Sequence, residues 1–142
     1  MALSKDTPRK YDPAVNPIFM DIPGKVSTTF YEGAAVTDDG GNGEADNLAA
    51  SEGFLGFVEK GVITNATTSD INVKIRTKGI IKNVPVTGLD ADTDFGVAVY
   101  MSDNGTFTLT SSTTFVQIGK AVAYSGTNYG DVFFQGAVVR SI

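Results

Sequence analysis

The sequence contains no cysteine, no histidine and no tryptophan among its 142 residues. Without cysteine the chain has no disulfide, no thiolate metal ligand and no thiol nucleophile. Without histidine it lacks the usual general base near neutral pH, the Ser-His-Asp triad and the ligand of most zinc or iron sites. The composition therefore argues against an enzyme, and we expect no cofactor and no metal.

Basic residues are also scarce, since 11 lysines and arginines stand against 16 aspartates and glutamates and give a net charge of -5. A protein that binds nucleic acid needs a basic surface to displace counterions, so no nucleic-acid partner is expected. No apolar run reaches about 18 residues, so no membrane-spanning helix is predicted. Residues 1–8 lack the apolar stretch of a secretory signal, and we expect no membrane partner.

What the chain has instead is a composition typical of strands and turns, with 16 glycines and many valines and threonines. In residues 97–101 and 107–110, apolar side chains alternate with polar or small ones around the pair Asn104-Gly105. Alternation with a period of two predicts half-buried strands, and Asn-Gly tolerates the positive φ of a tight turn. We predict a β-hairpin with a buried aliphatic face and a solvated threonine-rich face.

Strand-like segments recur along residues 26–142 about every 8–12 residues, with no convincing helix between them, as in β-barrels and β-sandwiches. The cleanest alternation, in residues 71–79, places apolar side chains on one face and Lys74, Arg76 and Lys78 on the other. Further strands are expected at residues 26–31, 32–37, 54–59, 80–86, 115–124 and 131–139. We predict an all-β fold in which residues 26–142 form one small, compact β-barrel or sandwich domain.

Two glycines lie inside predicted strands. Gly56 interrupts residues 54–59, and Gly119 interrupts residues 115–124. A glycine within a strand pattern indicates a bulge or a close approach of another backbone. Gly56 is therefore expected to mark a close backbone approach or a bulge, and Gly119 to mark a bend in its strand.

Residues 1–25 differ from the rest, because they hold four of the five prolines and carry four basic and three acidic residues. Prolines spaced four to six residues apart forbid a helix and interrupt a central strand, so this segment is predicted to be an extended arm. With Tyr11, Ile18, Phe19 and Ile22 the arm is too apolar for a solvated tail. These side chains need a surface to lie on, which is either the protein's own domain or a partner.

The loop of residues 38–46 has part of the spacing of a calcium-binding loop. Asp38, Asn42 and Asp46 match positions 1, 5 and 9 of the EF-hand pattern. A glycine stands at position 3, however, and an alanine replaces the bidentate glutamate at position 12. A solvated hairpin loop is the favoured interpretation, and ion binding stays open.

Asp90, Asp92 and Asp94 alternate within one short segment. Two carboxylates held across a cleft can hydrolyse glycosides. Three of them in one segment are better explained as an exposed turn whose carboxylates accept hydrogen bonds from nearby backbone.

Lys74, Arg76 and Lys78 form a basic row, with Lys82 nearby. Such a row fits an acidic partner surface or a neighbouring subunit. Lysines also protect sheet edges from mispairing, and an ordinary solvated strand face is the favoured interpretation.

Several segments, in order along most of the chain, carry a family resemblance. They are M-A-L-S-K-D-T-P-R at residues 1–9, S-T-T-F-Y-E-G-A-A-V at 27–36, F-L-G-F-V at 54–58, N-V-K-I-R-T-K-G at 72–79, V-Y-M-S-D-N-G-T-F-T-L-T at 99–110 and I-G-K-A-V at 118–122. Taken together they resemble the small capsid decoration (head cement) proteins of tailed bacteriophages. The long 38–46 loop and the proline-dense arm depart from that family.

The resemblance implies a structural protein without enzymatic activity that binds the outer surface of the expanded capsid, often as a trimer, and holds the shell against packaged DNA. It implies the major capsid protein as partner and a place on the outside of the virion, with the protein made in the bacterial host cytoplasm. Removing residues 1–22 is then expected to abolish capsid binding and to leave the domain folded. The expected contact residues are Tyr11, Ile18, Phe19 and Ile22 of the arm, with Lys74, Arg76 and Lys78 as a second contact face.

Two other functions remain as alternatives. The first is another virion component, such as a tail tube or fibre module, which predicts hexameric or filamentous self-assembly. The second is a carbohydrate-binding module, for which Tyr124 and Tyr129 near residues 126–130 offer only a thin aromatic platform.

Overall fold

The computed structural model describes residues 2–40, 43–50, 52–68, 70–93 and 95–137. It confirms the predicted all-β fold. The strands are β1 (Ile18–Pro23), β2 (Thr29–Phe30), β3 (Ala35–Asp38), β4 (Ala45–Asn47), β5 (Phe54–Val58), β6 (Val62–Ile63), β7 (Asn72–Thr87), β8 (Ala98–Met101), β9 (Phe107–Thr108), β10 (Val116–Gly126) and β11 (Tyr129–Gln135). Among the described residues, no helix has the length and hydropathy needed to cross a membrane.

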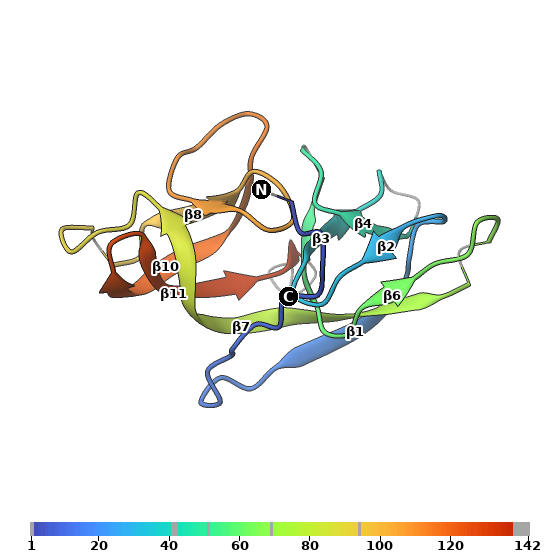
Figure 1. Cartoon of the computed structure of the whole chain (residues 1–142), viewed down its shortest axis with the longest axis horizontal. Helices are drawn as coiled ribbons and strands as arrows, with labels where there is room; N and C mark the ends of the chain where they lie inside the picture. Colours follow the sequence, from blue (N-terminus) through green and yellow to red (C-terminus); the bar gives the residue numbers. More distant parts are fainter. Residues whose placement is uncertain (1, 41–42, 51, 69, 94, 138–142) are drawn as a thin grey trace.

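The longest strand, β7, runs through the whole elongated molecule (Figure 1). Its 16 residues extend for roughly 50 Å at about 3.3 Å per residue. The sequence predicted that residues 80–86 continue in a strand-like manner beyond Gly79, and the structure has one continuous strand there. Gly79 leaves room for the Phe134 ring, which would lie 3.3 Å from a Cβ at this position.

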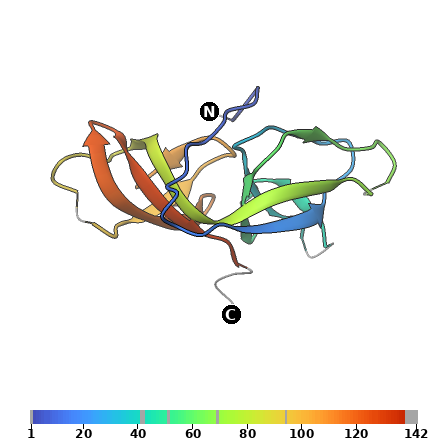
Figure 2. The same cartoon turned by 90° about the horizontal axis from the view of Figure 1, so that it is seen from below.

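Both edges of β7 are paired along its length. In the first half Ile75 pairs with Met20 of β1 and with Val58 of β5, so these two strands lie on opposite edges. The second half pairs antiparallel with β11 and parallel with β9. Because β11, β10, β8 and β9 also pair in turn, they close with β7 into a small β-barrel, the barrel lobe. The first half of β7 and strands β1 to β6 form the second lobe (Figure 2).

A bulge in β7 keeps its apolar residues pointing inward. Asn83 has a φ of 52°, a conformation that asparagine tolerates better than most residues, and the pairing with β11 shifts by one residue there. Asp131 binds the bulge, since its Oδ1 accepts the Asn83 N–H at 2.8 Å and its Oδ2 lies 2.9 Å from Lys82 Nζ. Ile81 before the bulge and Val84 after it are both buried, so the extra residue lets the apolar side chains that follow point inward again.

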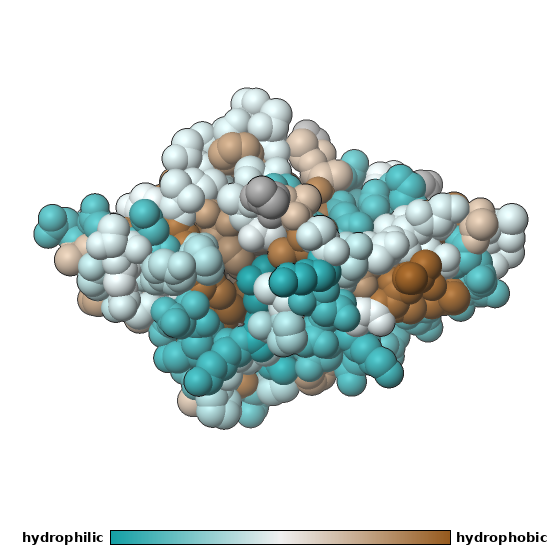
Figure 3. Space-filling model, viewed as in Figure 1, coloured by the Kyte–Doolittle hydropathy of each residue, from teal (hydrophilic) through white to brown (hydrophobic). Residues whose placement is uncertain are grey.

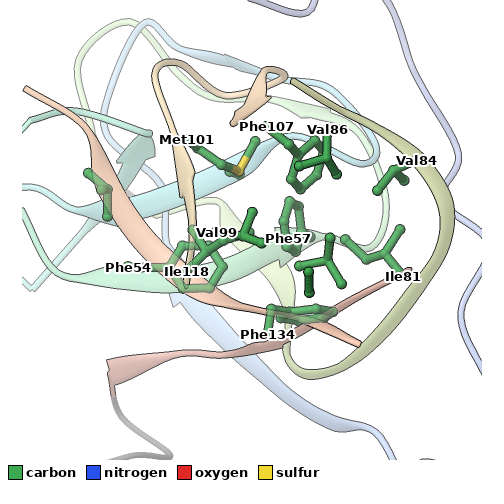
Figure 4. Close-up of a cluster of buried hydrophobic side chains, with 14 of the residues drawn as sticks. Phe54, Phe57, Ile81, Val84, Val86, Val99, Met101, Phe107, Ile118 and Phe134 are labelled. Carbon is green, nitrogen blue, oxygen red and sulfur yellow. The ribbon is translucent and has the colours of Figure 1, made fainter. Parts of the chain in front are cut away.

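Strand β5 separates two hydrophobic cores, one in each lobe. Phe57 points into the barrel core, whereas Leu55 and Val58 point into the core of the second lobe. Figure 4 shows Phe57 between Phe107 and Phe134, with ring centroids 5.9 Å and 4.8 Å away. Burial on both faces explains why this segment is apolar throughout instead of alternating.

The predicted hairpin is present as β8 and β9, with Tyr100 opposite Thr108 and Met101 opposite Phe107. The expected tight turn is not, because residues 102–106 form a longer connection in which neither Asn104 nor Gly105 has a positive φ. The prediction of a solvated threonine face is wrong at Thr108, which is only 7% exposed. The reason is that β9 is not an edge strand, because its other edge pairs with the end of β7.

Two predicted strands have different bounds in the structure. The strand expected at residues 26–31 shortens to β2, after Ser27 adopts a φ of 53° that breaks the extended backbone. The strand expected at residues 131–139 begins earlier and ends at Gln135 as β11. Residues 138 and 139 lie outside the described part of the chain.

The close approach predicted at Gly56 is confirmed, and Gly119, expected only as a bend, is a second close approach. A Cβ on Gly56, whose φ is +149°, would overlap the carbonyl oxygen of Arg76 in β7. A Cβ on Gly119 would overlap the carbonyl oxygen of Phe133 in β11. Both glycines let neighbouring strands meet without a side chain between them.

Replacing Gly56→Ala should lower the free energy of unfolding by about 1–3 kcal/mol, the usual cost of overpacking, because the clash is with backbone. Gly126→Ala is the matched control, since its Cβ would meet only Tyr129 Cβ at 3.9 Å. Urea unfolding of both variants measures the difference. Equal stability of the two would contradict the tight contact between β5 and β7.

Candidate partner-binding surface

The N-terminal segment lies on the protein's own body. It passes between the two lobes (Figure 2) and hydrogen-bonds to both, since Thr7 N–H donates to the Glu32 carbonyl at 2.8 Å and Asp12 N–H to the Ile80 carbonyl at 2.9 Å. Residues 18–23 then form β1 along one edge of β7. The sequence left two surfaces open for this segment, the protein's own domain or a partner. The described residues of the segment lie on the protein's own domain.

The four apolar residues expected to contact a partner divide into two pairs. Tyr11 packs against the barrel core, with its ring 6.1 Å from that of Phe134, and Ile22 packs against the core of the second lobe. Ile18 and Phe19 remain 41% and 38% exposed. Only these two present a substantial apolar surface to a partner.

Arg76 joins the N-terminal segment to the rest of the protein. Its guanidinium carbon lies 3.9 Å from the Tyr11 ring centroid and 4.9 Å from that of Phe19. Its Nε donates to Glu59 Oε2 at 3.4 Å, and only 13% of its side chain is exposed. This residue is therefore a clamp between β1, β7 and the end of β5, and it is not part of a uniformly solvated basic face.

The two lysines of the basic row remain available at the surface. Lys74 is exposed, and its Nζ lies 4.7 Å from the Phe19 ring centroid. Lys78 is half-buried opposite Gln135 of β11 and has no ion-pair partner in the described part of the chain. Ile18, Phe19 and Lys74 together form what we call the β1 patch.

Burial shapes the electrostatics beneath the N-terminal segment. Burial lowers the pKa of Arg9, whose Nε donates to the Gly33 carbonyl at 3.0 Å and whose guanidinium faces the Phe107 ring at 5.3 Å. Burial also raises the pKa of Tyr11 well above its usual value, although the charges of Arg76 and Arg9 act in the opposite direction. Tyr11 is therefore neutral in the folded protein at all ordinary pH values.

The loop that resembles a calcium site is held by a lysine of the chain itself. Lys25 Nζ lies 3.3 Å from Asp46 Oδ2 and 3.8 Å from Asp39 Oδ1. No group of three or more acidic side chains placed to hold a metal ion occurs within the described ranges, and Asn42 lies outside them. The ammonium group thus occupies the position where these carboxylates converge.

Residues 90–93 of the acidic segment form a turn, as predicted for Asp90. Its Oδ1 accepts the Asp92 N–H at 2.9 Å and the Thr93 hydroxyl at 3.2 Å. Asp94 lies outside the described residues.

Sequence reasoning missed an exposed apolar groove at the end of the barrel lobe. Phe95 is 81% exposed and lines a groove of about 520 Å³ together with Val122 and Tyr124. Tyr129, at the turn of the same β10–β11 hairpin, is 46% exposed. No pattern in the sequence indicated the groove, because Phe95 follows an acidic turn and comes close to β10 only in the folded chain.

On the face drawn in Figure 3, exposed hydrophobic side chains gather over β6, where Ile63 is 71% exposed. This position provides an exposed apolar residue remote in sequence from the β1 patch.

A second missed surface is a small polar groove on β10 and β11. It is lined by Gln117, Ile118, Gly119, Lys120, Phe133 and Gln135 and has a volume of about 220 Å³. We call it the β10–β11 groove.

No family model matches the chain, and no curated protein matches it in sequence. A chain in the solved structure named "The capsid of Myoviridae Phage XM1" has a similar fold, with a TM-score of 0.60. The match covers 94% of this chain and 92% of that chain at 18% identity. At this level of identity the likeness shows a shared all-β fold over nearly the whole of both chains.

Replacing Arg76→Ala should lower the free energy of unfolding by about 2 kcal/mol or more, because it removes two ring contacts and a charged hydrogen bond. Lys74→Ala, on the same strand and exposed, should cost at most about 1 kcal/mol. Chemical unfolding of the two variants tests the clamp. Similar losses in both would mean that Arg76 does not hold the N-terminal segment.

The raised pKa of Tyr11 predicts a loss of stability at alkaline pH. A group whose pKa is raised on folding contributes stability below its unfolded pKa, here about 10, and this contribution disappears as the pH rises beyond it. Above about pH 10 the wild type should therefore lose stability faster than Tyr11→Phe. Unfolding curves across this range provide the measurement.

A spectroscopic control separates Tyr11 from other alkaline effects. While the protein stays folded at about pH 11, Tyr11→Phe should leave the phenolate absorbance unchanged, because Tyr11 is still protonated. A decrease equal to one tyrosine would contradict the buried, neutral state.

Proposed function

We propose that this protein is a structural component of a phage virion that binds the outer surface of the expanded capsid and cements its capsomers. The observation that carries the proposal is the fold shared with a chain of a phage capsid structure over 94% of this chain. The resemblance of its sequence motifs to capsid decoration proteins points in the same direction. The proposed partner is the major capsid protein, and the proposed assembly is a trimer.

The β1 patch is the proposed contact with the shell. In the described part of the chain β1 pairs with β7 alone, so the peptide groups along its other edge have no strand partner. An extended segment of another protein can add to such an edge through main-chain hydrogen bonds. Ile18 and Phe19 would supply apolar contact area, and Lys74 beside the Phe19 ring would supply charge.

Cementing follows from mass action. A protein that binds only the assembled, expanded shell stabilises that state in proportion to its occupancy. Each copy contributes little, but many copies that bridge the seams between capsomers add buried area at every seam.

Co-sedimentation with mature shells stripped of the protein tests this function, with unexpanded procapsids as the control. Saturable binding to the expanded shell alone is the expected result, and it gives the copy number per shell. Binding to neither shell would overturn the proposal. Hexamers or filaments seen by light scattering would then favour a tail tube or fibre module.

The β1 patch has its own test. Ile18→Ser with Phe19→Ser should weaken binding to expanded shells by about tenfold or more, since exposed apolar anchors carry most interface energy. Ile63→Ser, which removes a 71% exposed residue on β6, should leave binding unchanged. Unchanged binding of the double variant would exclude the β1 patch as the contact.

These point variants replace the simpler truncation of residues 1–22. That truncation would remove most of β1, including Met20 and Ile22, which pair with Ile75 and Val73 of β7. A loss of binding by the truncated chain would then report damage to the fold as well as loss of a contact.

A further inference from the structure

The β10–β11 groove lies between strands that are already fully paired. Strand β10 pairs with β8 and β11, and β11 pairs with β10 and β7. Unlike the edge of β1, this surface has no free main-chain edge and recognises a partner through side chains alone. Gly119 lets β11 approach β10 closely here, because the carbonyl oxygen of Phe133 occupies the space of a side chain.

The side chains that line the groove are hydrogen-bond donors without partners. In the described part of the chain Gln117, Gln135 and Lys120 make no hydrogen bond or ion pair through their side chains. Lys78 stands directly opposite Gln135 on β7 and adds a second unpaired ammonium group. The groove thus presents two amides and the Lys120 ammonium group, and Lys78 stands beside it, between Gln135 of β11 and Ile18 of β1.

The nearest acidic side chain on these strands is already neutralised. Asp131 of β11 is only 8% exposed, and it is bound by Lys82 Nζ and by the Asn83 N–H. The local surface is therefore positive, although the whole chain has a net charge of -5.

The groove also has an apolar wall. Phe133 is half-buried, pairs with Lys120 across the two strands and lines the groove. The volume of the groove, about 220 Å³, corresponds to roughly seven water molecules at about 30 Å³ each. This combination suits a carboxylate on a short aliphatic stem, as in a glutamate side chain.

We infer that the β10–β11 groove binds an acidic side chain from an extended segment of the shell protein. The inference rests on the proposed function and adds a second contact to the β1 patch. The carboxylate accepts hydrogen bonds from Gln117 and Gln135 and pairs with Lys120 and Lys78, while its stem packs on Phe133. Charge complementarity then fixes the orientation of each copy on the shell.

Charge reversal at the groove tests the inference on expanded shells. Lys78→Glu with Lys120→Glu should weaken binding by about tenfold or more. Lys5→Glu with Lys60→Glu changes two exposed lysines elsewhere and lowers the net charge from -5 to -9 in the same way. This control should bind within about twofold of the wild type, so equal losses in both would overturn the inference.

A second pair of variants guards against misfolding. Gln117→Glu with Gln135→Glu keeps the size of both side chains but turns donors into carboxylates, so it should weaken binding as well. Unchanged binding by this variant would overturn the assignment. Failure of the wild type to bind shells at all would instead overturn the proposed function.

A solution experiment tests the groove independently of the shell. Titration of the isotope-labelled full chain with a hexaglutamate peptide should shift the side-chain amide signals of Gln117 and Gln135 and the backbone signal of Lys120, with saturation. Absence of these shifts, or shifts spread over all lysines alike, would overturn the inference.

Discussion

The pairing of β7 along both of its edges is the constraint on which both hydrophobic cores depend. Its first half holds β1 and β5, and its second half holds β9 and β11. The 16 residues of β7 contribute to both lobes. A one-residue shift in the pairing register of β7 would therefore turn the side chains that it contributes to both cores to the other face of the sheet. The Asn83 bulge, bound by Asp131, and the glycine contacts at Gly56 and Gly79 fix that register locally.

Arg76 extends this constraint to the N-terminal segment. Stacked on Tyr11 and Phe19 and bonded to Glu59, it connects β1 and the crossing segment to the body of the protein. The cost of placing a guanidinium at 13% exposure is offset by the ring contacts and the carboxylate. The proline-rich segment is consequently part of the folded unit. Because β1 is already ordered as a strand, the proposed binding of a partner at its free edge would not incur the entropy cost of ordering it.

Patterns within a few residues predicted much of the fold but not its closure. The hairpin formed by β8 and β9 and the close approach at Gly56 depend on local sequence, and the structure confirms them. The burial of Thr108 and the inward role of Arg76 depend on strands far apart in sequence. Period-two alternation shows which residues share a face, but not which strand covers it. For the same reason Lys120 and Gln135 could not be grouped from the sequence.

The distribution of charge explains how an acidic protein can meet an acidic partner. Several of its lysines and arginines serve internal contacts, as Lys25 does with Asp46, Lys82 with Asp131 and Arg76 with Glu59. The cations left without such partners near the proposed contacts are Lys74, which lies beside the Phe19 ring on the β1 patch, and Lys120, which lines the β10–β11 groove. Long-range repulsion from the net charge is screened within about 8–10 Å at physiological salt, whereas paired groups in contact are not. In the proposed binding mode, local patches therefore decide which surface faces the shell.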